Sequence, residues 1–146
     1  MTSQGQPSAI RTPKYDIIRL AAKRPNYHGG IELEPNEIAR KAVEIAADRK
    51  AEDIVMLDIS KVSTIADYFV ICNGTGDRQV RAIAKEIDEK LGELGINPIN
   101  VEGMTDARWV LMDYGAVLVH IFDPATREFY RLEQLWSEAQ PVLVVQ

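Results

Sequence analysis

The sequence predicts a single α/β domain in which helices flank a sheet of both parallel and antiparallel strands. The chain has 146 residues, 46% of them hydrophobic, which is enough to build one core. Between residues 68 and 101 a strand, a glycine turn, a helix and a strand follow one another, and this order predicts a parallel crossover. Two further strand-like runs are separated only by Tyr114 and Gly115, the spacing of an antiparallel hairpin. The predicted sheet is therefore mixed.

The predicted domain occupies residues 33–139, between a flexible arm at 1–32 and a short tail at 140–146 to which we assign no structure. The arm is rich in polar and helix-breaking residues. Up to position 31 it carries Asp16 as its only acidic residue against five basic ones, so an organellar transit peptide stays open as an alternative to a cytoplasmic protein. No run approaches the ~20 apolar residues that cross a membrane. The single cysteine, Cys72, can form no internal disulfide.

The first half of the domain is expected to begin with a helix and two strands. A helix over 35–49 is predicted because Glu34 can cap it, Pro35 suits its first turn and apolar residues then recur at helical spacing. Apolar runs at 54–59 and 68–72, each followed by turn-forming residues, predict strands.

The second half contains the clearest helix and the hairpin. Residues 77–94 place their apolar side chains in one stripe, and Gly95 provides a stop. Residues 97–101 can return as a strand, and the hairpin then uses strands at 109–113 and 116–122. A last turn or helix follows and carries the apolar residues Phe129, Leu132, Leu135 and Trp136.

The turn GTGDRQV lies between a predicted strand and a helix, a place where backbone amides can bind phosphate. The dinucleotide fingerprint requires a glycine where this chain has Gln79, and the Gly-Lys-Ser/Thr ending of a P-loop is absent. Asp77 would also compete with an anion for the same amides. A structural turn is the preferred interpretation, and a nucleotide-dependent transferase that uses GTGDRQV is the alternative.

No set of residues predicts a catalytic or metal site. A nucleotidyltransferase needs an Asp-x-Asp pair to hold its metal, whereas Asp58 and Asp113 stand alone on separate predicted strands. His28 and His120 have no metal-ligand spacing, and a structural role is the preferred interpretation of His120. We therefore predict a protein that is not an enzyme, with no cofactor and no metal.

Charge is divided unevenly along the chain. The first 35 residues hold 5 basic and 3 acidic residues, which leaves 12 basic and 19 acidic residues of the 17 and 22 in the chain, a net charge of −7. An acidic body favours basic partners and disfavours direct contact with a phosphate backbone, although it also serves solubility.

The hairpin carries the residues most typical of a binding surface. Strand alternation places Trp109, Leu111 and Asp113 on one face, whereas Val110 and Met112 point to the other and Tyr114 lies at the turn. If Val110 and Met112 face the core, an indole, a leucine and a carboxylate stand together on an exposed face. The alternative, that Trp109 and Leu111 lie under a helix, stays equally open.

Six strings, ADYFVIC, GTGDRQV, VEG, WVLMDYG, VHIF and REFYRLEQLW, occur in this order along the chain. Together they resemble the ribosomal silencing factor family, also called RsfS or Iojap, over about residues 36–137. In that family a serine often stands where this chain has Gly76, so the following helix is expected to be capped by Thr75 or Asp77 instead.

The resemblance implies a nucleotidyltransferase-like fold without the catalytic carboxylates. It also implies a protein that binds large-subunit ribosomal protein L-fourteen at the face where the small subunit docks. A factor bound there would sterically keep the subunits from joining and would repress translation under nutrient limitation.

Contact with a basic ribosomal protein calls for apolar anchors beside acidic groups. On the resemblance, Trp109 and Tyr114 would be the anchors, Leu111 would extend them, Asp113 would pair with a cation, and Glu102 is a weaker acidic candidate. Direct RNA contact is expected to be minor or absent, and a homodimer through the same residues is an alternative. Trp109→Ala and Asp113→Lys are expected to weaken binding and leave the fold intact.

Overall fold

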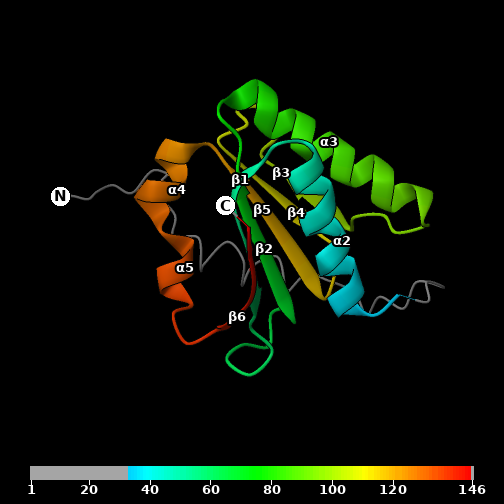
Figure 1. Cartoon of the computed structure of the whole chain (residues 1–146), viewed down its shortest axis with the longest axis vertical. Helices are drawn as coiled ribbons and strands as arrows, with labels where there is room; N and C mark the ends of the chain where they lie inside the picture. The colour runs from blue at the N-terminus through cyan, green and yellow to red at the C-terminus, as the bar shows by residue number, and fades with distance from the viewer. Residues whose placement is uncertain (1–32, 146) are drawn as a thin grey trace.

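The structure, a computed structural model, describes residues 33–145 and has helices on both faces of one sheet (Figure 1). The expected arm at 1–32 lies outside the described residues. The elements in chain order are α2 (Pro35–Asp48), β1 (Glu52–Asp58), β2 (Tyr68–Asn73), α3 (Asp77–Glu93), β3 (Asn100–Glu102), β4 (Trp109–Asp113), β5 (Val117–Phe122), α4 (Pro124–Tyr130), α5 (Leu132–Leu135) and β6 (Gln140–Val145).

The sheet has six strands in the order β3-β4-β5-β2-β1-β6. Strands β2 and β5 pair in parallel, and the other neighbouring pairs are antiparallel. The predicted mixed α/β class is confirmed. The crossover through α3 is also confirmed in its direction, because β3 runs parallel to β2, but β5 and β4 lie between the two strands. The hairpin of β4 and β5 supplies the strands that separate them.

Helix α2 begins where the sequence predicts, because its first turn is satisfied locally. The Glu37 carboxylate accepts a hydrogen bond of 2.8 Å from the backbone N–H of Glu34, and Pro35 occupies the first turn. Its apolar stripe packs against the sheet and is buried at Ala39, Ala42, Val43, Ile45 and Ala46.

Two hydrophobic cores lie on opposite faces of the sheet. The first lies beneath α2 and α3 and includes Met56, Val70, Val110 and Met112. The second lies beneath α4 and α5 and includes Leu57, Phe69, Leu111, Phe122 and Trp136. Since both faces are covered, every strand in the middle of the sheet carries apolar residues on both sides.

Strand β6 is the main difference from the sequence prediction, which assigned no structure after residue 139. Residues 140–145 pair antiparallel with β1, and the register shifts between Met56 and Leu57. The partner strand is some ninety positions earlier in the chain, as in the pair Ile54 and Val145, so no local pattern could reveal the pairing. The segment is too short to be distinguished from a loop by alternation alone.

Candidate functional site

Trp109 begins strand β4 and lies at the border of the second core. Its indole is half-buried and stacks on Phe122, the residue opposite it in β5, with ring centroids 5.0 Å apart. Tyr130 from α4 also contacts the indole, with ring centroids 5.1 Å apart. The indole is thus held by one aromatic ring from the hairpin and one from α4.

His120 lies directly behind the indole. Its side chain is fully buried, and its Nδ1 accepts a hydrogen bond of 3.1 Å from the indole Nε1–H of Trp109. Burial lowers the pKa of the imidazole from 6.5 to about 3, so the ring is neutral at pH 7. With Nδ1 engaged and no solvent access, His120 is a structural residue rather than a general base, as the sequence predicts.

This burial predicts a pH dependence of stability. Because the folded pKa of about 3 is below the unfolded value of 6.5, the unfolded state binds more protons between these limits. The free energy of unfolding is therefore unaffected by this titration above pH 6.5. Below that pH it falls by about 1.4 kcal/mol per pH unit until the folded pKa is reached. Urea unfolding between pH 7 and pH 5 should show this loss in the natural protein and a clearly smaller loss in His120→Leu. Equal pH slopes would contradict it.

Leu111, Asp113 and Tyr114 are buried, although a direct contact with a partner would need them exposed. Their exposed fractions are only 6%, 2% and 4%. Leu111 belongs to the second core, beneath α4 and α5. For Leu111, the alternative in which this face of the hairpin lies under a helix is therefore correct. Tyr114 lies in the first core, on the opposite face, where burial raises its pKa. The hairpin therefore divides these side chains between two cores.

Asp113 has a structural function in the hairpin turn. Its Oδ1 accepts a hydrogen bond of 2.8 Å from the backbone N–H of Gly115, and its side chain is buried. A lysine at this position would lose the turn acceptor and bury an ammonium group. The variant Asp113→Lys therefore disturbs the fold and is unsuitable as a test of a partner contact.

Two of the residues predicted for binding, Trp109 and Glu102, are half-exposed and share a face of the sheet. Glu102 lies in β3 opposite Leu111, and its carboxylate accepts a hydrogen bond of 3.1 Å from the Asn100 amide. Since residues opposite one another in an antiparallel pair point to the same face, Glu102 lies on the face of Leu111 and Trp109.

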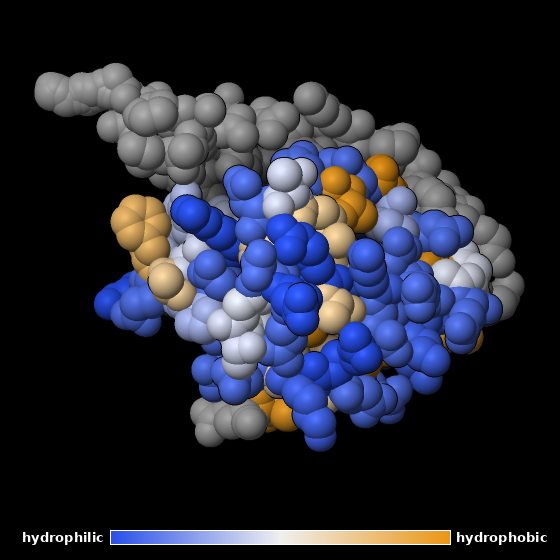
Figure 2. Space-filling view, turned by 90° about the horizontal axis from the view of Figure 1, so that it is seen from above, coloured by the Kyte–Doolittle hydropathy of each residue, from blue (hydrophilic) through white to orange (hydrophobic). Residues whose placement is uncertain are grey.

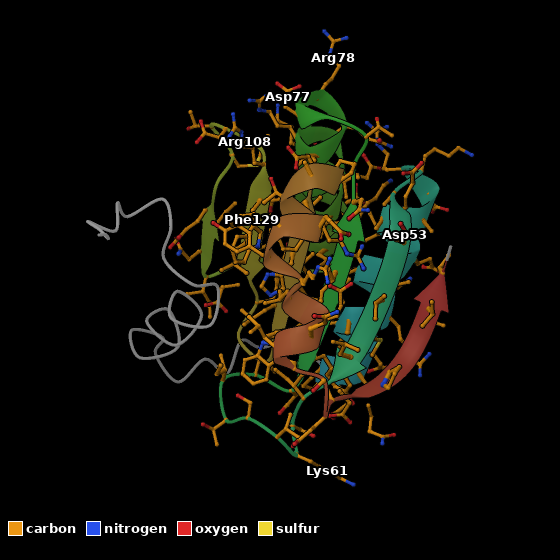
Figure 3. All side chains as sticks on the ribbon, turned by 90° about the vertical axis from the view of Figure 1, so that its left-hand side faces the viewer. Asp53, Lys61, Asp77, Arg78, Arg108 and Phe129 are labelled. Atoms are coloured by element: carbon orange, nitrogen blue, oxygen red, sulfur yellow. The ribbon has the colours of Figure 1, made fainter. Side chains whose placement is uncertain are left out.

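Phe129 extends this face and was missed as a binding residue in the sequence. Its side chain is 72% exposed at the side of α4 (Figure 3). It meets Tyr130 edge-on at 5.0 Å, and Tyr130 in turn meets Trp109. We call Phe129, Tyr130 and Trp109 the aromatic edge. The sequence placed Phe129 among the apolar positions of the last helix, but α4 has only seven residues and none of them is buried.

The glycine turn is tied to the end of α2 by Gln79. The Oε1 of Gln79 accepts hydrogen bonds from the backbone N–H of Thr75 at 2.7 Å and from its hydroxyl at 2.9 Å. Its Nε2 donates to the carbonyl oxygens of Arg49 and Lys50, both at 3.1 Å. Thus the residue that replaces the fingerprint glycine joins the turn to α2.

Helix α3 begins at this turn without the expected cap. Gly76 is the N-cap, and neither Thr75 nor Asp77 caps the helix with its side chain; Asp77 instead pairs with Arg81 at 3.2 Å. Figure 2 views the molecule from this end, and the described residues there are mainly hydrophilic. The turn therefore serves as a connection between α2, β2 and α3.

Asp58 and Asp113 cannot share a metal ion. They lie on strands separated by β5 and β2, and alternation directs them to opposite faces. The hydroxyl and the backbone N–H of Ser60 donate to Asp58, which lowers the pKa of its carboxyl group. Among residues 33–145 no three His, Cys, Asp or Glu side chains are grouped so that they could hold a metal.

A cavity of about 650 Å³ opens between α4, α5 and strands β1 and β6. Arg127 lines it, and its Nη1 donates to the Asp53 carbonyl at 2.6 Å and to the Asn73 amide oxygen at 3.0 Å. Its Nε and Nη2 both donate to the Glu133 carboxylate. Because every guanidinium nitrogen of Arg127 already has a protein acceptor, Arg127 is not free to bind an anion in this cavity.

The part of the chain described by the structure contains no helix long and apolar enough to cross a bilayer. Residues 32–146 match the family described as "Ribosomal silencing factor during starvation". The chain belongs to the ribosomal silencing factor family. The family resemblance inferred from the six strings is thereby confirmed.

Individual members of the ribosomal silencing factor family agree with this assignment. The ribosomal silencing factor of Bacillus subtilis is 45% identical over 107 residues, which are 73% of this chain and 91% of that protein. A mouse relative named "Mitochondrial assembly of ribosomal large subunit protein 1" is 30% identical over 65% of this chain and 43% of its own length. A crystal structure of a Chromobacterium violaceum protein has a TM-score of 0.71 and 37% identity, covering 78% of this chain and 95% of that chain.

Proposed function

We propose that this protein binds the large ribosomal subunit through ribosomal protein L-fourteen and sterically blocks joining of the small subunit. Translation would then be repressed when nutrients are limited. The observation that carries the proposal is membership of the ribosomal silencing factor family over residues 32–146. The mouse relative's name, which refers to the large ribosomal subunit, supports this choice of subunit. The proposal contains no catalytic step and places the protein in the cytoplasm.

The aromatic edge and Glu102 are the proposed contact surface. Exposed aromatic side chains held in place by neighbouring rings are typical anchors of protein interfaces. The chain has a net charge of −5, which favours approach to a basic ribosomal protein, and Glu102 supplies a carboxylate beside the aromatic residues. Leu111 packs in the second core next to this surface, and direct RNA contact is expected to be minor.

Co-sedimentation with large subunits tests this proposal. Trp109→Ala and Phe129→Ala should each weaken binding, Trp109→Ala by about 2 kcal/mol or roughly thirtyfold, because each removes an aromatic anchor. Leu94→Ala is the matched control, since Leu94 is also an exposed apolar side chain, at 48%, but follows α3 on the other face of the sheet. Circular dichroism should confirm that each variant is folded.

Subunit joining gives the second measurement. The natural protein should reduce the formation of complete ribosomes from separated subunits, and Phe129→Ala should relieve this block. Binding without any effect on joining would contradict the steric mechanism. Unchanged binding by both aromatic variants would remove the aromatic edge from the contact. Light scattering across a dilution series tests the alternative, in which a second copy of the chain covers this surface in a homodimer.

A further inference from the structure

His120 is a polar residue in a place that favours an apolar one. It lies in β5 opposite Leu111, is fully buried, and its ring meets Phe69 edge-on at 4.8 Å. Its Nε2 has no hydrogen-bond partner among the described residues. A buried polar nitrogen without a partner is destabilising, and a leucine at this position would avoid that loss. Packing alone therefore does not account for a histidine here.

The hydrogen bond to Trp109 distinguishes histidine from an apolar residue. An indole N–H is a donor only, and Nδ1 of His120 is its acceptor at 3.1 Å. Phe122 and Tyr130 restrict the plane of the indole, with interplanar angles of 26° and 48°. A half-turn about the second side-chain torsion would leave the indole in the same plane, because torsions of this type have broad, roughly two-fold preferences. The acceptor selects one of the two orientations.

The selected orientation decides what the indole offers to a partner. Since the N–H is directed inward to His120, it is not available for a hydrogen bond across an interface. A partner meets only carbon atoms of the indole. Aliphatic and aromatic side chains are the groups that suit such a surface.

We propose that His120 is the positioning residue of the aromatic edge: its Nδ1 holds the Trp109 indole in one orientation, and this orientation determines affinity for the ribosomal partner. The inference rests on the proposed function for the identity of that partner. The orientation of the indole itself depends only on the contacts between Trp109, His120 and their aromatic neighbours.

Substitutions that keep or remove the acceptor test this role. His120→Asn keeps an oxygen close to the place of Nδ1, whereas His120→Leu has none. The chain has two tryptophans, and their indole N–H signals are to be recorded by proton-nitrogen NMR, with Trp109→Phe identifying the signal of Trp109. Solvent exchange of that signal reports the hydrogen bond, co-sedimentation with large subunits reports affinity, and urea unfolding reports stability.

In His120→Leu we expect faster exchange of the Trp109 N–H and about three- to tenfold weaker binding, the range of one net hydrogen bond. Stability at pH 7 should be close to that of the natural protein, because removal of the unpaired Nε2 offsets the loss of the acceptor of the Trp109 N–H. His120→Asn should recover binding to within about twofold. When Trp109 is already phenylalanine, His120→Leu should leave affinity unchanged. Loss of affinity without loss of stability separates positioning from a merely structural role.

Unchanged affinity in His120→Leu, with the natural protein bound to large subunits, would overturn the inference. Fast exchange of the Trp109 N–H in the natural protein would also overturn it. This measurement does not depend on whether the His120 variants fold. If the natural protein does not bind large subunits at all, the proposed function fails. In that case the exchange data still decide whether His120 orients the indole.

Discussion

Gly103→Ala is expected to destabilise the protein by about 3 kcal/mol or more, or to prevent folding. Gly103 has a φ of +95°, a conformation that residues with a side chain rarely adopt. A Cβ atom built there would lie 2.0 Å from the backbone carbonyl oxygen of Trp109. Because the obstacle is backbone, no side-chain rotation can relieve the clash. The loop after β3 would have to move away from β4.

Gly76→Ala is the matched control for this prediction. A Cβ at Gly76 meets nothing within 4 Å, and its φ of −168° is extended backbone that any residue adopts. Urea unfolding should show a loss of at most about 1 kcal/mol for this variant, the usual effect of alanine at a helix N-cap. Similar urea midpoints for the two variants would show that the close approach at Gly103 is unimportant.

Arg127→Ala is expected to lower the free energy of unfolding by about 3 kcal/mol. The Arg127 side chain is only 11% exposed and joins α4 to β1, β2 and α5 through Asp53, Asn73 and Glu133. Its removal would leave the buried Asn73, the half-buried Glu133 and the exposed Asp53 without their donor. Arg127→Lys should be nearly as damaging, since an ammonium group cannot reproduce the planar fork of the guanidinium.

Urea unfolding with Lys41→Ala as the control checks the Arg127 prediction. Lys41 pairs with Glu44 at 3.5 Å, but the two side chains are 49% and 65% exposed, so this substitution should change stability by less than about 0.5 kcal/mol. Hydrogen exchange should locate the loss, with the backbone amides of α4 losing more protection in Arg127→Ala than those of α2. Uniform loss in both helices would contradict a local anchoring role.

Much of the fold could be predicted because its signals are local. The apolar stripe of α3, the Glu34 and Pro35 start of α2, and the short connection between β4 and β5 are each contained within one segment. The position of β6 could not be predicted, since pairing with β1 depends on residues far apart in the chain. The place of β3 at the sheet edge likewise depends on the hairpin entering between it and β2.

The candidate site could be predicted only in part. Alternation correctly grouped Trp109 with Leu111, but it could not tell which of these residues the helices after the hairpin would cover. The sequence places Phe129 among the apolar positions of a helix, but in the structure no residue of α4 is buried and Phe129 is exposed. Its contact with Tyr130, and through Tyr130 with Trp109, joins α4 to the hairpin.

By itself the sequence determined the mixed α/β class, the family, and the lack of an Asp-x-Asp pair or a phosphate-binding fingerprint, because these depend on residue types and short spacings. Only the tertiary structure decided which side chains are available to a partner. The alternation of side chains along a strand assigns each residue to one face of the sheet, but it does not show which elements pack on that face. Here α4 and α5 cover Leu111 and leave Trp109 half-exposed. His120, in β5, accepts the indole N–H.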